Sequence, residues 1–236
     1  MPSRSEEPAT GWTDLARPLA AEAVGTAFLL AAVVGSGIMG ERLAGGNAAV
    51  ALLANSVATG AALAALILVF GPVSGAQFNP AVTVAEAARG ALAWRVAAAY
   101  VGAQVAGALV GVAAANVMFG EPVFAASRHV RTGYGQWLGE IVATFGLFVV
   151  IRGCARWRPA AAPLVVGGWI LAAYWFTSST SFANPAVTLA RAWTDTFAGI
   201  RPADVPGFLA AQATGAAAAT VFFRWLAPAA PAKVAP

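Results

Sequence analysis

Charged residues are scarce in this sequence. Asp, Glu, Lys and Arg together make up 10% of the 236 residues, whereas about 25% is usual in soluble globular domains. Hydrophobic residues account for 59%, and many of them gather in long runs, as transmembrane segments do. The net charge of +4 comes from basic residues spread over the polar segments, which disfavours a nucleic-acid partner. The composition indicates an integral protein of the lipid bilayer.

Cysteine and histidine are almost absent. Cys154 is the only cysteine, which excludes an internal disulfide, and His129 is the only histidine. No nucleophile–base pair and no cluster of His, Cys and acidic residues is visible, so the sequence indicates no catalytic residue, metal site or cofactor and disfavours an enzyme. Segments of alternating polar and apolar residues are also lacking, which argues against a β-barrel. The predicted fold class is an all-α membrane protein.

Six apolar segments are predicted to be transmembrane helices. They cover about 17–39, 48–70, 92–119, 137–151, 161–177 and 205–226. Gly71-Pro72 is expected to end the second segment, because a helix continues poorly into proline. A basic loop with Arg152, Arg156 and Arg158 is expected after the fourth. Residues 17–226 are predicted to form one domain between an N-terminal tail, 1–16, and a C-terminal tail, 227–236.

A pentapeptide occurs twice, as Asn79-Pro80-Ala81-Val82-Thr83 and as Asn184-Pro185-Ala186-Val187-Thr188. Because Asn is a preferred N-cap and Pro suits the first helical position, each copy predicts the start of a helix. The apolar stretches that follow end near Ala88 and Trp193, which is too short to cross a bilayer core of about 30 Å. Each copy therefore predicts a half-length helix that stops inside the membrane.

The two halves of the chain repeat the same order of motifs. Glu22-x-Val24-x-Thr26 corresponds to Glu140-x-Val142-x-Thr144, and Ala103-Gln104-x-x-Gly107-Ala108 corresponds to Ala211-Gln212-x-x-Gly215-Ala216. The first repeat is predicted at 17–119 and the second at 137–226, each with three transmembrane segments and one half-helix. Three is an odd number, so the repeats have opposite orientations, and the half-helices enter from opposite faces to meet near the midplane.

The two facing helix starts predict the electrostatics of a pore. A helix N-terminus carries about half a positive charge, so two of them at the midplane would repel cations, including hydronium. The side-chain amides of Asn79 and Asn184 would still donate hydrogen bonds to a neutral solute. The pair of motifs therefore indicates a channel rather than two unrelated turns.

Lys and Arg are distributed unevenly over the predicted loops. With both termini in the cytoplasm, five of the 14 Lys and Arg residues would lie on the outer side, namely Arg42, Arg128, Arg131, Arg191 and Arg201. The others would lie on the inner side. Because basic loops tend to remain cytoplasmic, we expect a multi-pass protein of the cell's inner or plasma membrane with both termini inside.

The chain resembles the aquaporin (major intrinsic protein) family over essentially all of 17–226. The residues that carry the resemblance are Ala21-Glu22-x-x-Gly25-Thr26, Ser74-Gly75-Ala76-Gln77-Phe78 with the first pentapeptide, Tyr100-x-x-Ala103-Gln104-x-x-Gly107, Glu140-x-x-Ala143-Thr144, and Phe182-Ala183-Asn184-Pro185-Ala186. The resemblance implies six spans with two re-entrant half-helices, a homotetramer with one pore per subunit, and passive flow of water or small neutral solutes. It also implies that Glu22, Glu140, Gln104 and Gln212 support the re-entrant loops.

One position departs from the family pattern. The family usually has Arg directly after the second Asn-Pro-Ala, where this chain has Val187. In the family that Arg belongs to a four-residue outer filter, which alignment places here at Thr59, Ala172, Ser181 and Val187, with Gly168 and Trp169 as alternatives to Ala172. This set predicts a wider and less cationic filter, open to glycerol-like polyols, urea or undissociated metalloid acids such as arsenous acid. The pattern most resembles bacterial aquaglyceroporin-like channels associated with arsenic resistance.

Alternative functions stay open at this stage. A water-selective aquaporin is one, and a proton-coupled secondary transporter is another, since inverted repeats and broken helices also occur there. For the transporter, Glu22 and Glu140 are the candidate proton carriers. A structural membrane protein that packs against other cells is a third. Arg191, one turn beyond Val187, is expected at the surface or outer vestibule, although it could supply part of the missing positive charge.

Overall fold

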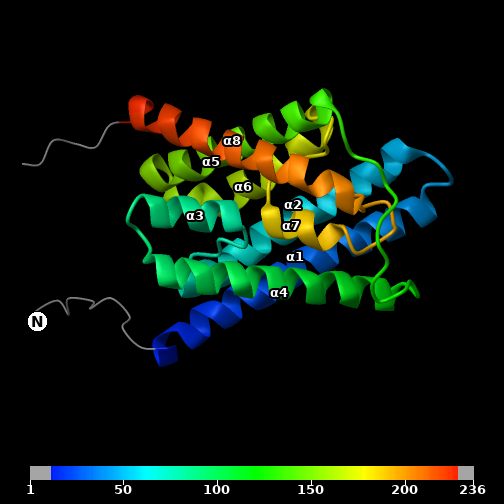
Figure 1. The fold of residues 1–236 in the computed structure, drawn as a ribbon, viewed down its shortest axis with the longest axis horizontal. Helices are drawn as coiled ribbons and strands as arrows, with labels where there is room; N and C mark the ends of the chain where they lie inside the picture. The colour runs from blue at the N-terminus through cyan, green and yellow to red at the C-terminus, as the bar shows by residue number, and fades with distance from the viewer. Residues whose placement is uncertain (1–11, 228–236) are drawn as a thin grey trace, which may run out of the picture.

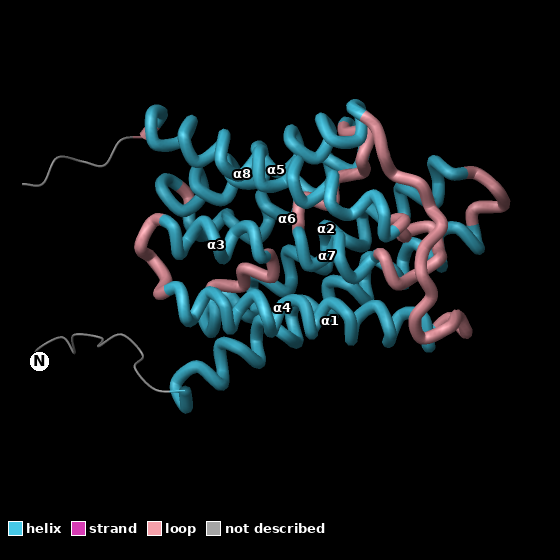
Figure 2. Tube along the Cα trace, in the orientation of Figure 1, coloured by secondary structure: helices cyan, strands magenta, loops and turns pink. Residues whose placement is uncertain are grey.

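The structure, a computed structural model, describes residues 12–227 and is helical throughout, with no strand in that part of the chain (Figure 2). Six helices are long and apolar enough to cross a membrane, as predicted. Their bounds are α1 Trp12–Leu43, α2 Ala48–Ser74, α4 Trp94–Met118, α5 Tyr134–Trp157, α6 Ala162–Phe176 and α8 Val205–Leu226. Two short helices, α3 Pro80–Ala88 and α7 Pro185–Arg191, follow the pentapeptide asparagines. Turns of 3₁₀ helix at Pro159–Ala161 and Pro202–Asp204 precede α6 and α8.

Several helices extend beyond their predicted ends. Helix α2 continues through Pro72 to Ser74, because the proline falls in the last turn and the N–H of Gly75, in a left-handed conformation, closes that turn on Gly71 O over 2.9 Å. Gly71-Pro72 therefore does not end this helix. Helix α5 includes Arg152 and Arg156, which were expected in a loop. Long cationic side chains are tolerated at a helix end because their charged groups reach polar surroundings.

The helix that opens the chain is also longer than predicted. Helix α1 begins at Trp12, so the predicted N-terminal tail 1–16 overlaps the helix in its last five positions. The remainder of that tail, residues 1–11, and residues 228–236 of the predicted C-terminal tail lie outside the described residues.

The helices form two similar groups related by the predicted inverted repeat. In the first group α1 packs against α2 and α4, and in the second α5 packs against α6 and α8. Helices α2 and α6 join the groups, while α7 packs against α4 and α3 against α8. Figure 1 shows α3 and α7 in the middle of the bundle, reaching inward from opposite ends. The first turn of α1 and the last turn of α8 lie at the same end, as six membrane crossings require.

Glycines allow the helices of each group to approach closely. A Cβ at Gly107 of α4 would collide with the backbone of α1 at Ala23, and one at Gly215 of α8 would meet the backbone of α5 in the second group. Gly60 and Gly167 face each other where α2 crosses α6. Small residues at such contacts are typical of membrane helices, where close packing replaces the hydrophobic effect as the force between helices. This packing sets the position of the re-entrant segments.

Candidate functional site

The two half-helices begin at the centre of the molecule, each capped by its own asparagine. The side-chain oxygen of Asn79 accepts a hydrogen bond from Ala81 N over 2.9 Å, and that of Asn184 accepts one from Ala186 N over 3.0 Å. Pro80 occupies the first helical position of α3, and Pro185 occupies that of α7. These are the favoured residues for a helix start, so the sequence itself dictates where both helices begin.

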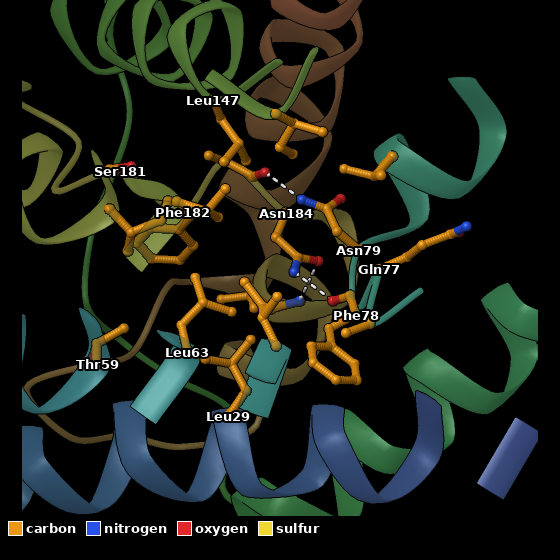
Figure 3. A pocket seen from close by; sticks show the side chains of 18 of the residues that line it. Leu29, Thr59, Leu63, Gln77, Phe78, Asn79, Leu147, Ser181, Phe182 and Asn184 are labelled. Carbon is orange, nitrogen blue, oxygen red and sulfur yellow. Dashed lines mark hydrogen bonds between the residues drawn. The ribbon is translucent and has the colours of Figure 1, made fainter. Parts of the chain in front are cut away.

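Each asparagine also reaches across to the opposite loop. Asn79 Nδ2 donates to Ala183 O over 2.8 Å, and Asn184 Nδ2 donates to Phe78 O over 2.7 Å (Figure 3). Phe78 and Ala183 both have left-handed backbones, with φ of +48° and +47°, which is uncommon for residues other than glycine. The two loops thus hold each other, and one N–H of each amide is left to face a solute.

A buried carboxylate shapes the first re-entrant loop. Glu22 accepts hydrogen bonds from Gln77 N at 2.9 Å, Phe78 N at 2.7 Å, Ser74 Oγ at 2.6 Å and Gln104 Nε2 at 2.8 Å. A buried charge is costly unless such donors surround it. The carboxylate therefore supplies the acceptors that the unusual loop backbone needs, which is the role that the family resemblance implies.

The second loop has an equivalent carboxylate. Glu140 accepts hydrogen bonds from Phe182 N at 2.8 Å, Ala183 N at 2.9 Å and Gln212 Nε2 at 2.6 Å. Gln212 also donates to Thr188 Oγ1 in α7. Both glutamates are fully buried, and neither is among the described residues that line the central cavity. Their position supports a loop-supporting role and gives a proton carrier no access to the pore.

A cavity of about 320 Å³ runs between the two groups of helices. Asn79 and Asn184 line it, together with apolar side chains such as Leu63 and Leu147 (Figure 3). The cavity reaches Tyr174, near the end of α6, and also Pro159, before its start. It therefore extends along most of the length of α6 and passes both asparagine amides.

Three of the four residues predicted for the outer filter line this cavity: Thr59, Ser181 and Val187. The fourth, Ala172, is exposed on the opposite side of α6, and Tyr174 lines the cavity in its place. Val166, Ile170 and Tyr174 line the cavity at intervals of four residues, which keeps them on one helix face. Ala172 lies between two of them in sequence and on the other face.

The two alternatives to Ala172 do not line the cavity either. Gly168 is exposed, and the Trp169 indole donates to Ala143 O over 3.1 Å. Of the residues predicted for the outer filter, Thr59, Ser181 and Val187 line the cavity, and on α6 it is Tyr174 that lines it instead of Ala172. Tyr174 is the residue that alignment missed, and the spacing of four residues along α6 was the signal that could have identified it.

Arg191 was expected at the surface or in the outer vestibule, and it is not at the surface. Its side chain is 1% exposed and lines the cavity. Its Nε donates to Ala198 O, and its guanidinium lies 3.4 Å from the centre of the Phe182 ring. Because residues four apart share a helix face, Arg191 lies one turn beyond Val187 on the cavity side of α7. That spacing is visible in the sequence, but it does not by itself predict that the side chain is buried.

A loop between α4 and α5, residues 119–133, crosses this end of the molecule (Figure 1). It is held to the segment after α7 by backbone hydrogen bonds, including Ser127 N to Ala192 O over 3.0 Å and Arg201 N to His129 O over 2.8 Å. Burial, with a further contribution from the positive charges of Arg131 and Arg191, lowers the pKa of His129. The histidine therefore favours its neutral form.

Arg131, in the same loop, is also buried close to the pore. Its Nε donates to Gly199 O over 2.8 Å, and its guanidinium lies 5.1 Å from the centre of the Phe182 ring. Burial lowers the pKa of Arg131 to about 10, so it stays charged at neutral pH. Two buried cations, Arg131 and Arg191, thus contact one aromatic ring beside the outer filter.

Known proteins are similar to this chain in sequence. Residues 10–179 match the family model described as Major intrinsic protein. The chain is 55% identical to "Aquaglyceroporin AqpS" of Rhizobium meliloti over 213 residues, covering 90% of this chain and 91% of the relative. It is 31% identical to "Aquaporin Z" of Bradyrhizobium diazoefficiens, covering 88% and 92%.

A solved structure shows the same fold. The X-ray structure of the aquaglyceroporin from Plasmodium falciparum aligns with a TM-score of 0.70 at 20% identity, covering 88% of this chain and 94% of that one. The family is one of membrane channels for water and small solutes rather than of enzymes. With its six membrane-crossing helices and two facing half-helices, the chain belongs to the major intrinsic protein family.

Proposed function

We propose that this protein is a passive channel for neutral solutes larger than water, namely glycerol-like polyols and undissociated metalloid acids such as arsenous acid, together with water itself. The observation that carries the proposal is Val187, which stands directly after the second Asn-Pro-Ala and lines the cavity. An uncharged side chain of three carbons there leaves more space than the usual arginine. The 55% identity to a protein named as an aquaglyceroporin supports the same substrate class.

The remaining surfaces of the pore suit small hydroxylated solutes. Most side chains that line the cavity are apolar, while the asparagine amides and the hydroxyls of Thr59, Tyr174 and Ser181 offer hydrogen bonds. Such a lining matches a molecule with carbon–hydrogen and hydroxyl faces, since a few polar groups among apolar ones orient a ligand. The N-termini of α3 and α7 keep a positive potential at the centre, which opposes cations.

A water-selective channel and a proton-coupled transporter are less well supported. A water-selective filter in this family commonly includes the arginine whose position Val187 takes here. A proton-coupled transporter requires a titratable carboxylate in the pore, and both buried glutamates are instead fully engaged in supporting the loops.

We further infer the setting of the channel. The distribution of Lys and Arg supports cytoplasmic termini in the cell's inner or plasma membrane, and family membership supports a homotetramer with a pore in each subunit. Cross-linking of the purified protein in detergent tests the tetramer, because a monomer band alone would contradict it.

Stopped-flow light scattering of proteoliposomes tests the solute proposal. Vesicles containing the protein should swell faster than empty vesicles in gradients of glycerol, urea and arsenous acid, and should also shrink faster in an impermeant osmolyte. Accelerated water flow without accelerated glycerol or arsenous acid flow would overturn the proposal and indicate a water-selective pore. Solute uptake that saturates and requires a proton gradient would instead indicate a transporter.

A further inference from the structure

Two polar atoms at the outer end of the cavity have no protein partner. Six buried side-chain atoms in the described part of the chain lack one, and the residues are Gln104, Gln136, Thr144, Ser181, Arg191 and Gln212. Of these residues, only Ser181 and Arg191 line the cavity. Both side chains are nearly inaccessible, at 2% and 1% exposed. A buried donor without a partner is destabilising, so each of these atoms is positioned to receive a partner that is not part of the protein.

The Arg191 side chain is fixed by contacts that leave Nη1 free. Its Nε is bonded to Ala198 O, and its guanidinium stacks on Phe182. The Phe182 ring is itself held by edge-to-face packing against Phe208, with ring centres 5.0 Å apart. The backbone carbonyl of Arg191 accepts a hydrogen bond from Ile200 N over 3.2 Å. A guanidinium anchored through one nitrogen presents the others in a fixed direction.

Arg191 forms no salt bridge with a carboxylate among the described residues. The salt bridges among the described residues involve other arginines, namely Arg42, Arg89, Arg128 and Arg201. Arg131, on the same aromatic ring, is likewise absent from these pairs. A buried charge without a partner favours whatever ligand brings a lone pair to it. The outer end of the cavity is therefore an electropositive site that prefers an acceptor oxygen.

We propose that Arg191 replaces, from one turn further along α7, the arginine that this chain lacks at position 187. Its Nη1 and the hydroxyl of Ser181 bind the oxygen atoms of a hydroxylated solute as it enters, and its charge excludes cations. This inference rests on the proposed solute class and adds the residue that selects for it. Four residues of helix correspond to about 6 Å, so selection by charge takes place outward of the level of the pore that contains Val187.

This displacement separates two properties that a single arginine at position 187 would combine. An arginine there would narrow the pore and also repel cations. Here Val187 leaves the pore wide at its own level, while Arg191 retains the positive charge at the entrance. A channel built this way admits bulkier neutral solutes and still excludes protons and metal cations.

Arg191→Gln, Arg191→Lys and Ser181→Ala test the proposal, with Arg128→Gln as the matched control. Arg128 lies in the loop between α4 and α5, at the same end of the molecule as Arg191, where its side chain is exposed and pairs with Asp195. Glycerol permeability and proton leak are measured in proteoliposomes, normalised to protein that elutes as a single folded species. Arg191→Gln should lower glycerol permeability about tenfold, the effect of one hydrogen bond to a charged group, and should raise proton leak. Arg191→Lys should keep the leak low, and Arg128→Gln should match the wild type.

Ser181→Ala keeps the proposal testable if Arg191→Gln fails to fold, because it removes only a hydroxyl without a protein partner. It should lower glycerol permeability severalfold and leave proton leak unchanged. Wild-type permeability in Ser181→Ala, or wild-type leak and permeability in folded Arg191→Gln, would overturn the inference. A wild-type channel that passes only water would overturn the proposed function instead, and the proton leak of the Arg191 variants would still measure the role of its charge.

Discussion

The hydroxyl of Tyr174 lies 3.3 Å from Thr59 Oγ1 and donates a hydrogen bond to it. The bond joins α6 to α2, the second long helix of each repeat, across the outer filter. It fixes the ring of Tyr174 at the edge of the cavity and leaves the Thr59 hydroxyl oriented by a protein partner. The size of the pore at this level therefore depends on Tyr174 as well as on Val187 and the smaller residues around it.

Tyr174→Ala should widen the pore. Removal of the aromatic ring from a cavity-lining position should raise the permeability to glycerol relative to that of water, measured by stopped-flow light scattering of proteoliposomes. Ala172→Val provides the control, because Ala172 is exposed on the far side of the same helix. Equal effects of the two substitutions would show that Tyr174 does not border the conducting path.

Val187→Arg should restrict the larger solutes first. A long cationic side chain at this cavity-lining position would occupy the space that we assign to glycerol and arsenous acid, whereas water needs less room. We expect glycerol permeability to fall about tenfold or more, comparable to other effects of filling a shaped pocket, with a smaller fall for water. The solute series is compared in one vesicle preparation, and an unchanged glycerol-to-water ratio would contradict the predicted role of position 187.

Glu140→Gln should destabilise the folded channel. Phe182 N donates to Glu140 Oε1, whereas Ala183 N and Gln212 Nε2 donate to Oε2. Glutamine keeps only one acceptor oxygen, and its amide nitrogen is a donor, so it cannot accept the bonds made to both carboxylate oxygens. Loss of charged hydrogen bonds of this kind costs about 3 kcal/mol. Thermal unfolding in detergent measures the loss, and Glu41→Gln, at an exposed site, should melt like the wild type. A folded Glu140→Gln protein with wild-type melting would disprove the loop-supporting role.

Gly107→Ala should loosen the contact between α1 and α4. The added methyl group would collide with backbone atoms at Ala23, which cannot rotate away. Overpacking of this kind costs about 1–3 kcal/mol, so the melting temperature should fall. Gly102→Ala in the same helix has open space around it and should be neutral or slightly stabilising. Reversed results for the two glycines would contradict the described helix contact.

Solute flux should not depend on pH between about 6.5 and 8. His129 is the only histidine, and its pKa is lowered by burial and by the neighbouring Arg131 and Arg191. The pKa of His129 is thus shifted below the ordinary value of about 6.5, and the neutral form of the side chain predominates across this range. Glycerol permeability is measured at matched pH inside and outside the vesicles. A step in this range that disappears in His129→Ala would show that the histidine gates the pore.

Sequence reasoning predicted the fold because local signals determine it. Long apolar runs specify the six spans, and an asparagine followed by proline specifies each half-helix start. The predicted ends of the helices were less accurate. Pro72 falls in the last turn of α2, where a proline is tolerated. Arg152 and Arg156 reach polar surroundings without ending α5. The end of a helix tolerates proline and arginine, so these residue types alone do not mark where a helix stops.

The residues around the outer filter were harder to predict because contacts between distant segments place them. Alignment counted back from Asn184 to Ala172 through a loop in which Thr180, Ser181 and Ala183 have left-handed backbones. Such a loop does not preserve the spacing between a helix and the motif that follows it. The burial of Arg191 depends on Phe182 and on Ala198, and no local pattern around Arg191 specifies either contact.

The reciprocal bonds between the asparagines and the opposite loops have a consequence for the order of assembly during synthesis. The first loop emerges from the ribosome before Ala183 exists, so the Asn79 amide enters the membrane without the acceptor that it bonds in the finished protein. The first repeat therefore cannot complete its own pore lining, however well its three spans insert. Arrival of the second repeat supplies the missing acceptor, so both loops are complete only when the chain is nearly finished.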